Sequence, residues 1–258
     1  MIFFKYAPII KWILFIFLFL SSQQLLAQDK CGTVLYHQIQ KERDVNKERE
    51  NVFEDFIQEK LKEKKANQAF KTQQNLYEIP VVIHIIHNGE AIGEEVNLSE
   101  ERILSQIKTL NEDYRRLNAD TILTPPQYLD VAADTEIEFV LARSDPNGSP
   151  TTGIIRIQGA KSGWRISEDE ELKRNSYWPA EDYLNIWVTN LASDLLGYSQ
   201  FPVSDLEGLE FSSNNRLTDG VVIDYLYFGE NADIFPRSIG RTTTHEVGHY
   251  LGLRHIWG

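Results

Sequence analysis

Residues 245–255 read HEVGHYLGLRH, and the spacing of the histidines constrains how this stretch can fold. His245 and His249 are four residues apart, so on an α-helix they lie one turn above each other and present their imidazoles from one face. Gly252 follows, and glycine best tolerates the left-handed conformation that can end a helix. The chain can then turn back and bring His255 to the same point. Three neutral imidazoles arranged in this way suit a tetrahedral Zn²⁺ with one open position.

Glu246 stands beside the first of these histidines, close to the expected metal but off the line of its ligands. In an HExxH pattern this position suits a general base that acts on zinc-bound water. The five fixed positions of HExxHxxGxxH, at roughly one in twenty each, arise by chance on the order of once in ten thousand chains. The motif therefore predicts Glu246 as the catalytic residue and His245, His249 and His255 as the metal ligands.

The motif and its flanks resemble the metzincin zinc metallopeptidases, and among them the pappalysin-type (cytophagalysin-like) branch found in secreted bacterial endopeptidases. The specific part of the match is GRTTTHEVGHYLGLRHIWG at 240–258, with looser matches at LNIWVTN (184–190), GYSQFP (197–202) and DGVVI (219–223). The resemblance implies an α+β fold, the metzincin-like upper subdomain, in which a twisted mixed sheet has a backing helix and a zinc-binding active-site helix. It also implies protein or peptide substrates that pair with an edge strand, for which residues 197–201 are our candidate.

Charge and composition exclude other classes of partner. The chain has 258 residues, of which 42% are hydrophobic and 25% charged, as in a globular protein with one sizeable core. Its net charge of −12 argues against binding nucleic acid or an anionic membrane surface through general electrostatics.

The first 27 residues are typical of a signal peptide. Lys5 and Lys11 form a basic start, residues 12–20 are an apolar run, and Ala27 is a small residue at the expected cleavage point. The alternative is an uncleaved anchor helix, but nine apolar residues fall short of the roughly twenty that span a bilayer. We therefore predict export to the extracellular space, with no stable membrane association after cleavage.

Residues 28–77 have the composition of a helical pro-segment. Residues 41–65 are dense in charged side chains and carry a narrow apolar stripe at Val52, Phe53, Phe56, Ile57 and Leu61, which predicts one amphipathic helix. Residues 64–74 lack apolar periodicity and suit an exposed, cleavable linker. The alternative is a partner-binding arm that the mature protein retains.

Cys31 is the single cysteine of the chain, so this exported protein cannot form an internal disulfide. A thiolate in the open position of the zinc would exclude the catalytic water. The pappalysin-type resemblance implies such a pro-segment cysteine, and Cys31 in Cys-Gly-Thr lies where one would be. A free thiol and a disulfide to another chain are the alternatives.

A catalytic domain is predicted for residues 78–258. A helix is expected at 99–117 with Ser99 as its N-cap and a loop at 121–128; strands are expected at 79–87, 136–142, 154–157, 183–190, 197–201 and 221–227. His84 and His87 are three apart and so face opposite sides of a strand, which predicts structural roles for both.

The chain departs from the metzincin pattern after the third histidine. Metzincins continue into a lower subdomain with a methionine turn beneath the metal, whereas here Met1 is the single methionine and the sequence ends at Gly258. We interpret the chain as a fragment or a truncated product. Zn²⁺ is the expected cofactor and Ca²⁺ is a possible second one, although any calcium ligands that follow the motif in the family are absent from this sequence. The alternative function is a catalytically inactive zinc-binding module.

Overall fold

The computed structural model describes residues 30–43, 56–63, 76–174, 176–200 and 216–255. The predicted signal peptide, the predicted linker, residues 44–55 of the predicted amphipathic helix, and residues 201–215 and 256–258 lie outside these ranges. Residues 56–63 are helical, as predicted, and two residues of their apolar stripe, Ile57 and Leu61, are exposed. A second helix in the segment predicted as a pro-segment, α2 (Thr33–Arg43), was not predicted from the sequence.

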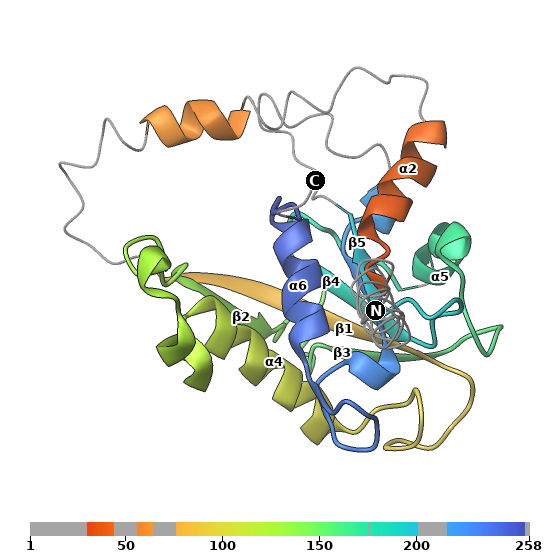
Figure 1. Cartoon of the computed structure of the whole chain (residues 1–258). Helices are drawn as coiled ribbons and strands as arrows, with labels where there is room; N and C mark the ends of the chain where they lie inside the picture. Colours follow the sequence, from red (N-terminus) through yellow and green to blue (C-terminus); the bar gives the residue numbers. More distant parts are fainter. Residues whose placement is uncertain (1–29, 44–55, 64–75, 175, 201–215, 256–258) are drawn as a thin grey trace, which may run out of the picture.

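A mixed sheet organises the rest of the chain (Figure 1). Its order is β2 (Ile137–Leu141), β1 (Tyr77–His87), β4 (Leu184–Thr189), β6 (Val221–Asp224) and β5 (Gly197–Ser199). All of these neighbours are parallel except β5, which runs antiparallel to β6, and β3 (Ile154–Gln158) pairs in parallel with the second half of β1. The predicted α+β architecture, with residues 197–199 as the outermost strand beyond β6, is confirmed.

The two faces of the sheet bury different cores. Helices α4 (Glu100–Tyr114) and α6 (Arg241–Tyr250) pack on one face over alternate residues of the central strands, among them Ile83, Ile186 and Ile223. The intervening residues, such as Trp187 and Val222, face a second core that includes Leu172 of α5 (Asp169–Arg174) and Tyr36 of α2. Because β1, β4 and β6 are covered on both sides, their residues form nearly continuous apolar runs rather than an alternating pattern.

Most element boundaries follow local chemistry. Ser99 caps α4 by accepting a hydrogen bond from the amide of Arg102, as predicted. Residues 121–128, predicted to be a loop, lie mostly in two short 3₁₀ helices, Ala119–Leu123 and Pro126–Tyr128. Strand β6 ends at Asp224 rather than continuing to residue 227, because the Asp224 carboxylate accepts from the amide of Leu226 and starts a 3₁₀ turn, Tyr225–Tyr227. A two-stranded pair, β7 (Glu230–Asn231) and β8 (Ser238–Ile239), precedes α6 and was not predicted.

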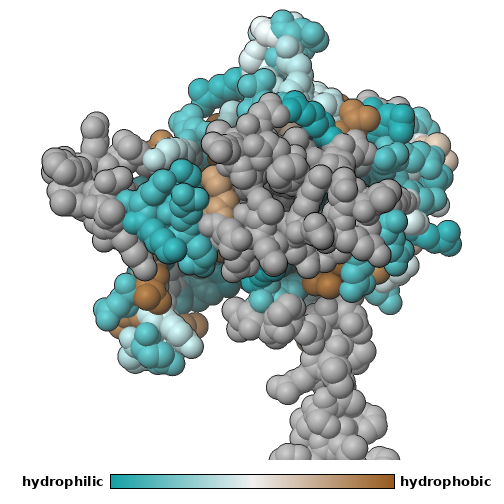
Figure 2. All heavy atoms as spheres, turned by 90° about the horizontal axis from the view of Figure 1, so that it is seen from above, coloured by the Kyte–Doolittle hydropathy of each residue, from teal (hydrophilic) through white to brown (hydrophobic). Residues whose placement is uncertain are grey.

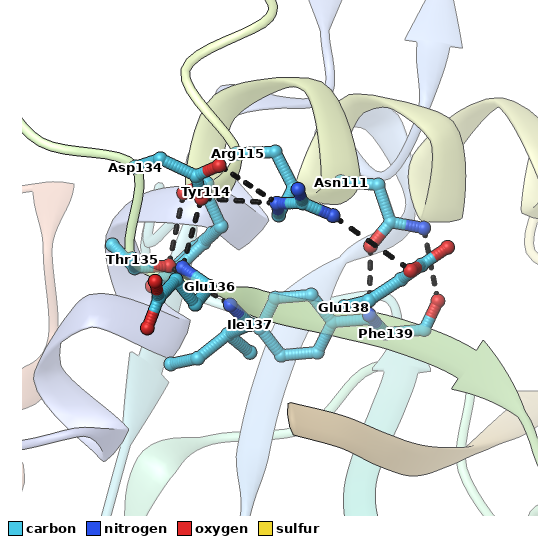
Figure 3. A network of polar contacts seen from close by, with 9 residues as sticks. All are labelled: Asn111, Tyr114, Arg115, Asp134, Thr135, Glu136, Ile137, Glu138 and Phe139. Atoms are coloured by element: carbon cyan, nitrogen blue, oxygen red, sulfur yellow. Dashed lines mark hydrogen bonds and ion pairs between the residues drawn. The ribbon is translucent and has the colours of Figure 1, made fainter. Parts of the chain in front are cut away.

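Side chains at the C-terminal end of α4 and just after it hold β2 at the edge of the sheet (Figure 3). The Asn111 amide donates to the Phe139 carbonyl at 3.0 Å and accepts from the Phe139 amide at 2.7 Å. Arg115 forms an ion pair with Asp134 at 2.9 Å, just before the strand. Asn111 thus satisfies backbone groups that an edge strand would otherwise leave open for pairing with another chain.

His84 is a buried structural residue, as predicted. Its Nε2 lies 2.9 Å from Asn185 Oδ1 and its ring stacks on Trp187 at 5.0 Å. Among the described residues its Nδ1 has no hydrogen-bond partner, so a second proton there would be buried without an acceptor. Burial lowers the pKa of His84 from 6.5 to about 4.

This environment predicts acid sensitivity of the fold. A folded-state pKa below the unfolded value of 6.5 gives stability that is full above pH 6.5 and is lost as pH falls toward 4. The loss attributable to His84 should reach about 3 kcal/mol in the free energy of unfolding. His84→Gln can still donate to Asn185 but does not titrate, so denaturant unfolding at pH 7.5 and 4.5 should show a smaller pH dependence in this variant. An equal pH dependence in the two proteins would contradict the assignment.

The described surface is mostly hydrophilic on the face shown in Figure 2, with hydrophobic residues at separate positions. Within the described ranges, the structure contains no helix whose length and apolar character would let it cross a membrane.

Candidate metal centre and catalytic site

Helix α6 places the first two histidines of the motif. It begins after Gly240, whose φ of 79° lies in the left-handed region, and it ends at Tyr250. Gly252 has a φ of 93°, so the chain turns where the sequence predicted and His255 returns toward the helix. Arg241 in the first turn of α6 forms an ion pair with Asp113 of α4 at 3.1 Å, which fixes the helix against its neighbour.

The three predicted metal ligands converge. The Nε2 atoms of His245 and His249 lie 3.0 Å apart, those of His249 and His255 3.0 Å apart, and those of His245 and His255 3.1 Å apart. Neighbouring nitrogen ligands of a tetrahedral zinc with bonds of about 2.0–2.1 Å are separated by roughly 3.3 Å, close to these values. The three side chains thus converge, as the motif HExxHxxGxxH predicts, at nearly the spacing that a single ion requires.

The protonation states of His245 and His249 also suit the binding of a cation. His249 Nδ1 lies 2.7 Å from the Leu253 carbonyl and donates its proton there, which leaves a lone pair on Nε2. Burial, with the neighbouring imidazoles, lowers the pKa of His245 to about 4, and burial lowers the pKa of His249. Neutral imidazoles with lone pairs turned to one point repel each other unless a positive ion lies between them.

Glu246 is buried beside this point, on the side of β5. Burial raises the pKa of its carboxyl to about 7. Its Oε2 accepts a hydrogen bond of 2.7 Å from the hydroxyl of Thr33. A Cβ added at Gly197 of β5 would come within 2.9 Å of Glu246 Cγ, so the absence of a side chain at residue 197 makes room for the carboxylate.

Cys31 is the fourth member of the cluster. Its Sγ lies 3.5 Å from His249 Nε2, and one ligand atom from each of the four residues falls within 4.8 Å of the others. Burial, and then the charge of Glu246, raise the pKa of the Cys31 thiol to about 12. A divalent cation at this position would oppose that shift, since a coordinated thiol is deprotonated. Among the described residues this is the one group of three or more His, Cys, Asp or Glu side chains that could hold a metal ion.

The backbone around Cys31 pairs with the edge strand. The amide of Gly32 donates to the Gly197 carbonyl at 2.8 Å, and the Lys30 carbonyl accepts from the amide of Leu196 at 2.9 Å. Cys31 and Gly197 form a parallel bridge. The N-terminal segment thus lies on the strand that the sequence predicted to bind substrate.

Sequence reasoning found the motif residues and Cys31 but not Thr33, which contacts Glu246 and also accepts from the amide of Ser199 at 3.0 Å. These contacts join residues 213 and 166 positions apart, and no local pattern indicates them. The position of Thr33 within Cys-Gly-Thr was the signal available.

Comparison with known proteins places this geometry in a family. Residues 167–258 match the family model described as pregnancy-associated plasma protein-A, a peptidase family. An extracellular metalloprotease of Arthroderma gypseum is 25% identical over 92% of this chain and 62% of its own length. Another, from Arthroderma otae, is 37% identical over 40% of this chain and 35% of its own length.

Solved structures decide the family. A promirolysin variant from Tannerella forsythia is 38% identical, with a TM-score of 0.65 over 89% of this chain and 70% of that chain. The chain belongs to the pappalysin-type metzincin metallopeptidases. Mature mirolysin in complex with a cleaved peptide is 46% identical, with a TM-score of 0.63 over 71% of this chain and 66% of that chain.

Two features of these pappalysin matches concern the organisation of the chain. The share of this chain that is matched rises from 71% with the mature form to 89% with the proform. The chain spans about a third to three fifths of the length of the two Arthroderma relatives. Pappalysin-type membership implies a bound metal, usually zinc, and the four-residue cluster is where the described residues could hold it.

Proposed function

We propose that the protein containing this chain is a secreted zinc-dependent endopeptidase that is made as a latent zymogen. The observation that carries the proposal is the convergence of three imidazole Nε2 atoms, 3.0–3.1 Å apart, beside a buried carboxylate. The family relatives named as extracellular metalloproteases support it. Residues 1–27 support export through their signal-peptide pattern.

His245, His249 and His255 would hold the zinc. A bound zinc supplies Lewis acidity, which lowers the pKa of a water molecule to about 7 and polarises a substrate carbonyl. The Leu253 carbonyl fixes the His249 ring in the tautomer that can bind a metal through Nε2.

Glu246 would act as the general base. Its Oε2 already accepts from a hydroxyl, that of Thr33, at 2.7 Å. With the N-terminal segment removed, a water molecule could take the donor position of that hydroxyl and lose its proton to the carboxylate during attack on a peptide carbonyl. Glu246 would then pass the proton to the leaving amine.

The N-terminal segment would keep the site latent in three ways. Cys31 Sγ occupies the fourth position of the cluster, where a water molecule would otherwise bind. The Thr33 hydroxyl donates a hydrogen bond to Glu246, the carboxylate that would activate this water. Parallel pairing of residues 30–32 with β5 also covers Gly197, where an extended substrate would find main-chain partners.

Removal of the metal tests the proposal. The full-length protein, after release of the N-terminal segment, should cleave an unfolded protein, and a chelator should abolish cleavage because three neutral imidazoles cannot polarise a carbonyl. Added zinc should restore it. Metal analysis by mass spectrometry should give one zinc per chain. Stoichiometric zinc without any cleavage would instead support an inactive zinc-binding module.

A further inference from the structure

Tyr36 of α2 is buried in the catalytic domain, although it belongs to the segment that we assign as pro-segment. Its side chain is 1% exposed and its ring lies 5.2 Å from the ring of Tyr198 in β5. Its hydroxyl donates to Asp169 Oδ2 at 2.9 Å, and its oxygen lies 2.6 Å from the side-chain amide of Gln200. If Cys31 at the metal were all that held the pro-segment, α2 would not need to bury the Tyr36 side chain in the catalytic domain.

The groups that receive Tyr36 form what we call the tyrosine socket, lined by Asp169, Lys173, Trp187, Tyr198, Gln200 and Thr218. Asp169 and Lys173 are completely buried and form an ion pair of 2.8 Å. Lys173 Nζ lies 5.5 Å from the centre of the Tyr36 ring, within the range of a cation–π interaction. The socket thus offers a cation to the face of an aromatic ring and a carboxylate to its hydroxyl.

The walls of the tyrosine socket support one another without Tyr36. Tyr198 donates to Asp169 Oδ1 at 2.8 Å, and Lys173 donates to the Thr218 carbonyl at 2.6 Å. The Thr218 hydroxyl donates to Gln200 Oε1 at 2.6 Å. All of these bonds lie within the catalytic domain, so the polar groups are oriented before the ring enters.

The tyrosine socket and the metal cluster lie on opposite faces of the sheet. Along β5, Gly197 faces Glu246 and α6, whereas the next residue, Tyr198, faces the core that contains Trp187 and Tyr36. Binding in the socket therefore requires none of the metal ligands.

We propose that the tyrosine socket is a second binding site for the pro-segment, selective for a phenol side chain and independent of the metal. The inference rests on the proposed zymogen. A phenylalanine at residue 36 would fill the same space but leave the buried Asp169 Oδ2 without the donor that Tyr36 supplies. Since a hydrogen bond to a charged group contributes more than a neutral one, this loss should weaken retention by about tenfold or more.

Retention of the cleaved pro-segment in metal-free protein tests the inference. A site for a specific protease would be placed within residues 64–74, and the cut protein would be kept in chelator while release of the N-terminal piece is followed by size-exclusion chromatography. The wild-type piece should stay bound, and Tyr36→Phe should be released about tenfold faster or more. Cys31→Ala should match the wild type in chelator and be released faster only when zinc is present.

Two controls make the result specific. Val34→Ala alters an exposed residue of the same helix and should leave release unchanged. Tyr198→Phe removes the other hydroxyl that donates to Asp169. Because Tyr198 belongs to the catalytic domain, this variant should change release less than Tyr36→Phe.

A synthetic peptide of residues 30–43 should compete for the emptied site, and its phenylalanine form should bind at least about tenfold more weakly.

Equal release of wild type and Tyr36→Phe in chelator, or equal competition by the two peptides, would overturn the inference. Since these readouts need neither metal nor hydrolysis, they are separate from the test of the proposed function.

Discussion

Glu246→Gln is expected to lower peptide hydrolysis by about 10²- to 10⁴-fold in the activated full-length protein. The glutamine amide has nearly the shape of the carboxylate but cannot accept a proton from water. The three histidines are unchanged, so the variant should retain one zinc per chain by mass spectrometry. The reduction should appear in kcat, measured with a peptide cut at one bond.

Glu230→Gln is a matched control, because this carboxylate is exposed and forms an ion pair with Arg237 near β8. It should leave kcat unchanged. Full activity of Glu246→Gln would remove Glu246 from the reaction, and loss of zinc from this variant would mean that the residue supports the metal site instead.

Cys31→Ala is expected to shorten the time that the proform needs to become active by about tenfold or more, since a lost metal–ligand bond exceeds the 1.4 kcal/mol that corresponds to a factor of ten. The structural reason is the position of Sγ, 3.5 Å from His249 Nε2. The lag before cleavage of a peptide substrate measures the effect.

Some latency should remain in Cys31→Ala, because Thr33 still donates a hydrogen bond to Glu246 and the backbone of residues 30–32 still pairs with β5. The double variant Cys31→Ala/Thr33→Val should shorten the lag further. Identical lag times for wild type and Cys31→Ala would show that the thiol does not take part in latency.

The sequence was informative where chemistry is local. The four-residue spacing of His245 and His249 and the left-handed Gly252 are consequences of helix geometry, and the structure confirms the convergence with His255. Strands β1 and β4 are buried on both faces, so their sequences are β-branched and apolar runs, and these runs predicted both strands. Helix α4 was predicted from its cap and its apolar stripe.

Other features depend on long-range contacts that no sequence window contains. Helix α2 carries no acidic residue in its first turn, and its burial depends on a tyrosine that meets Asp169 133 positions later. The role of Thr33 needed the position of Glu246, which only the folded sheet supplies.

The long separation of these contacts has a consequence for the order of folding. Residues 31–36 are made before the domain they contact, and their contacts reach partners 133 to 218 residues later in the chain. Closing so large a loop costs entropy that grows with its length, so such contacts form after the more local ones. We expect the sheet and α6 to assemble before residues 30–36 dock. The newly folded domain would then pass through a short-lived state in which its histidines are open to a metal ion, and closure by Cys31 would follow metal uptake.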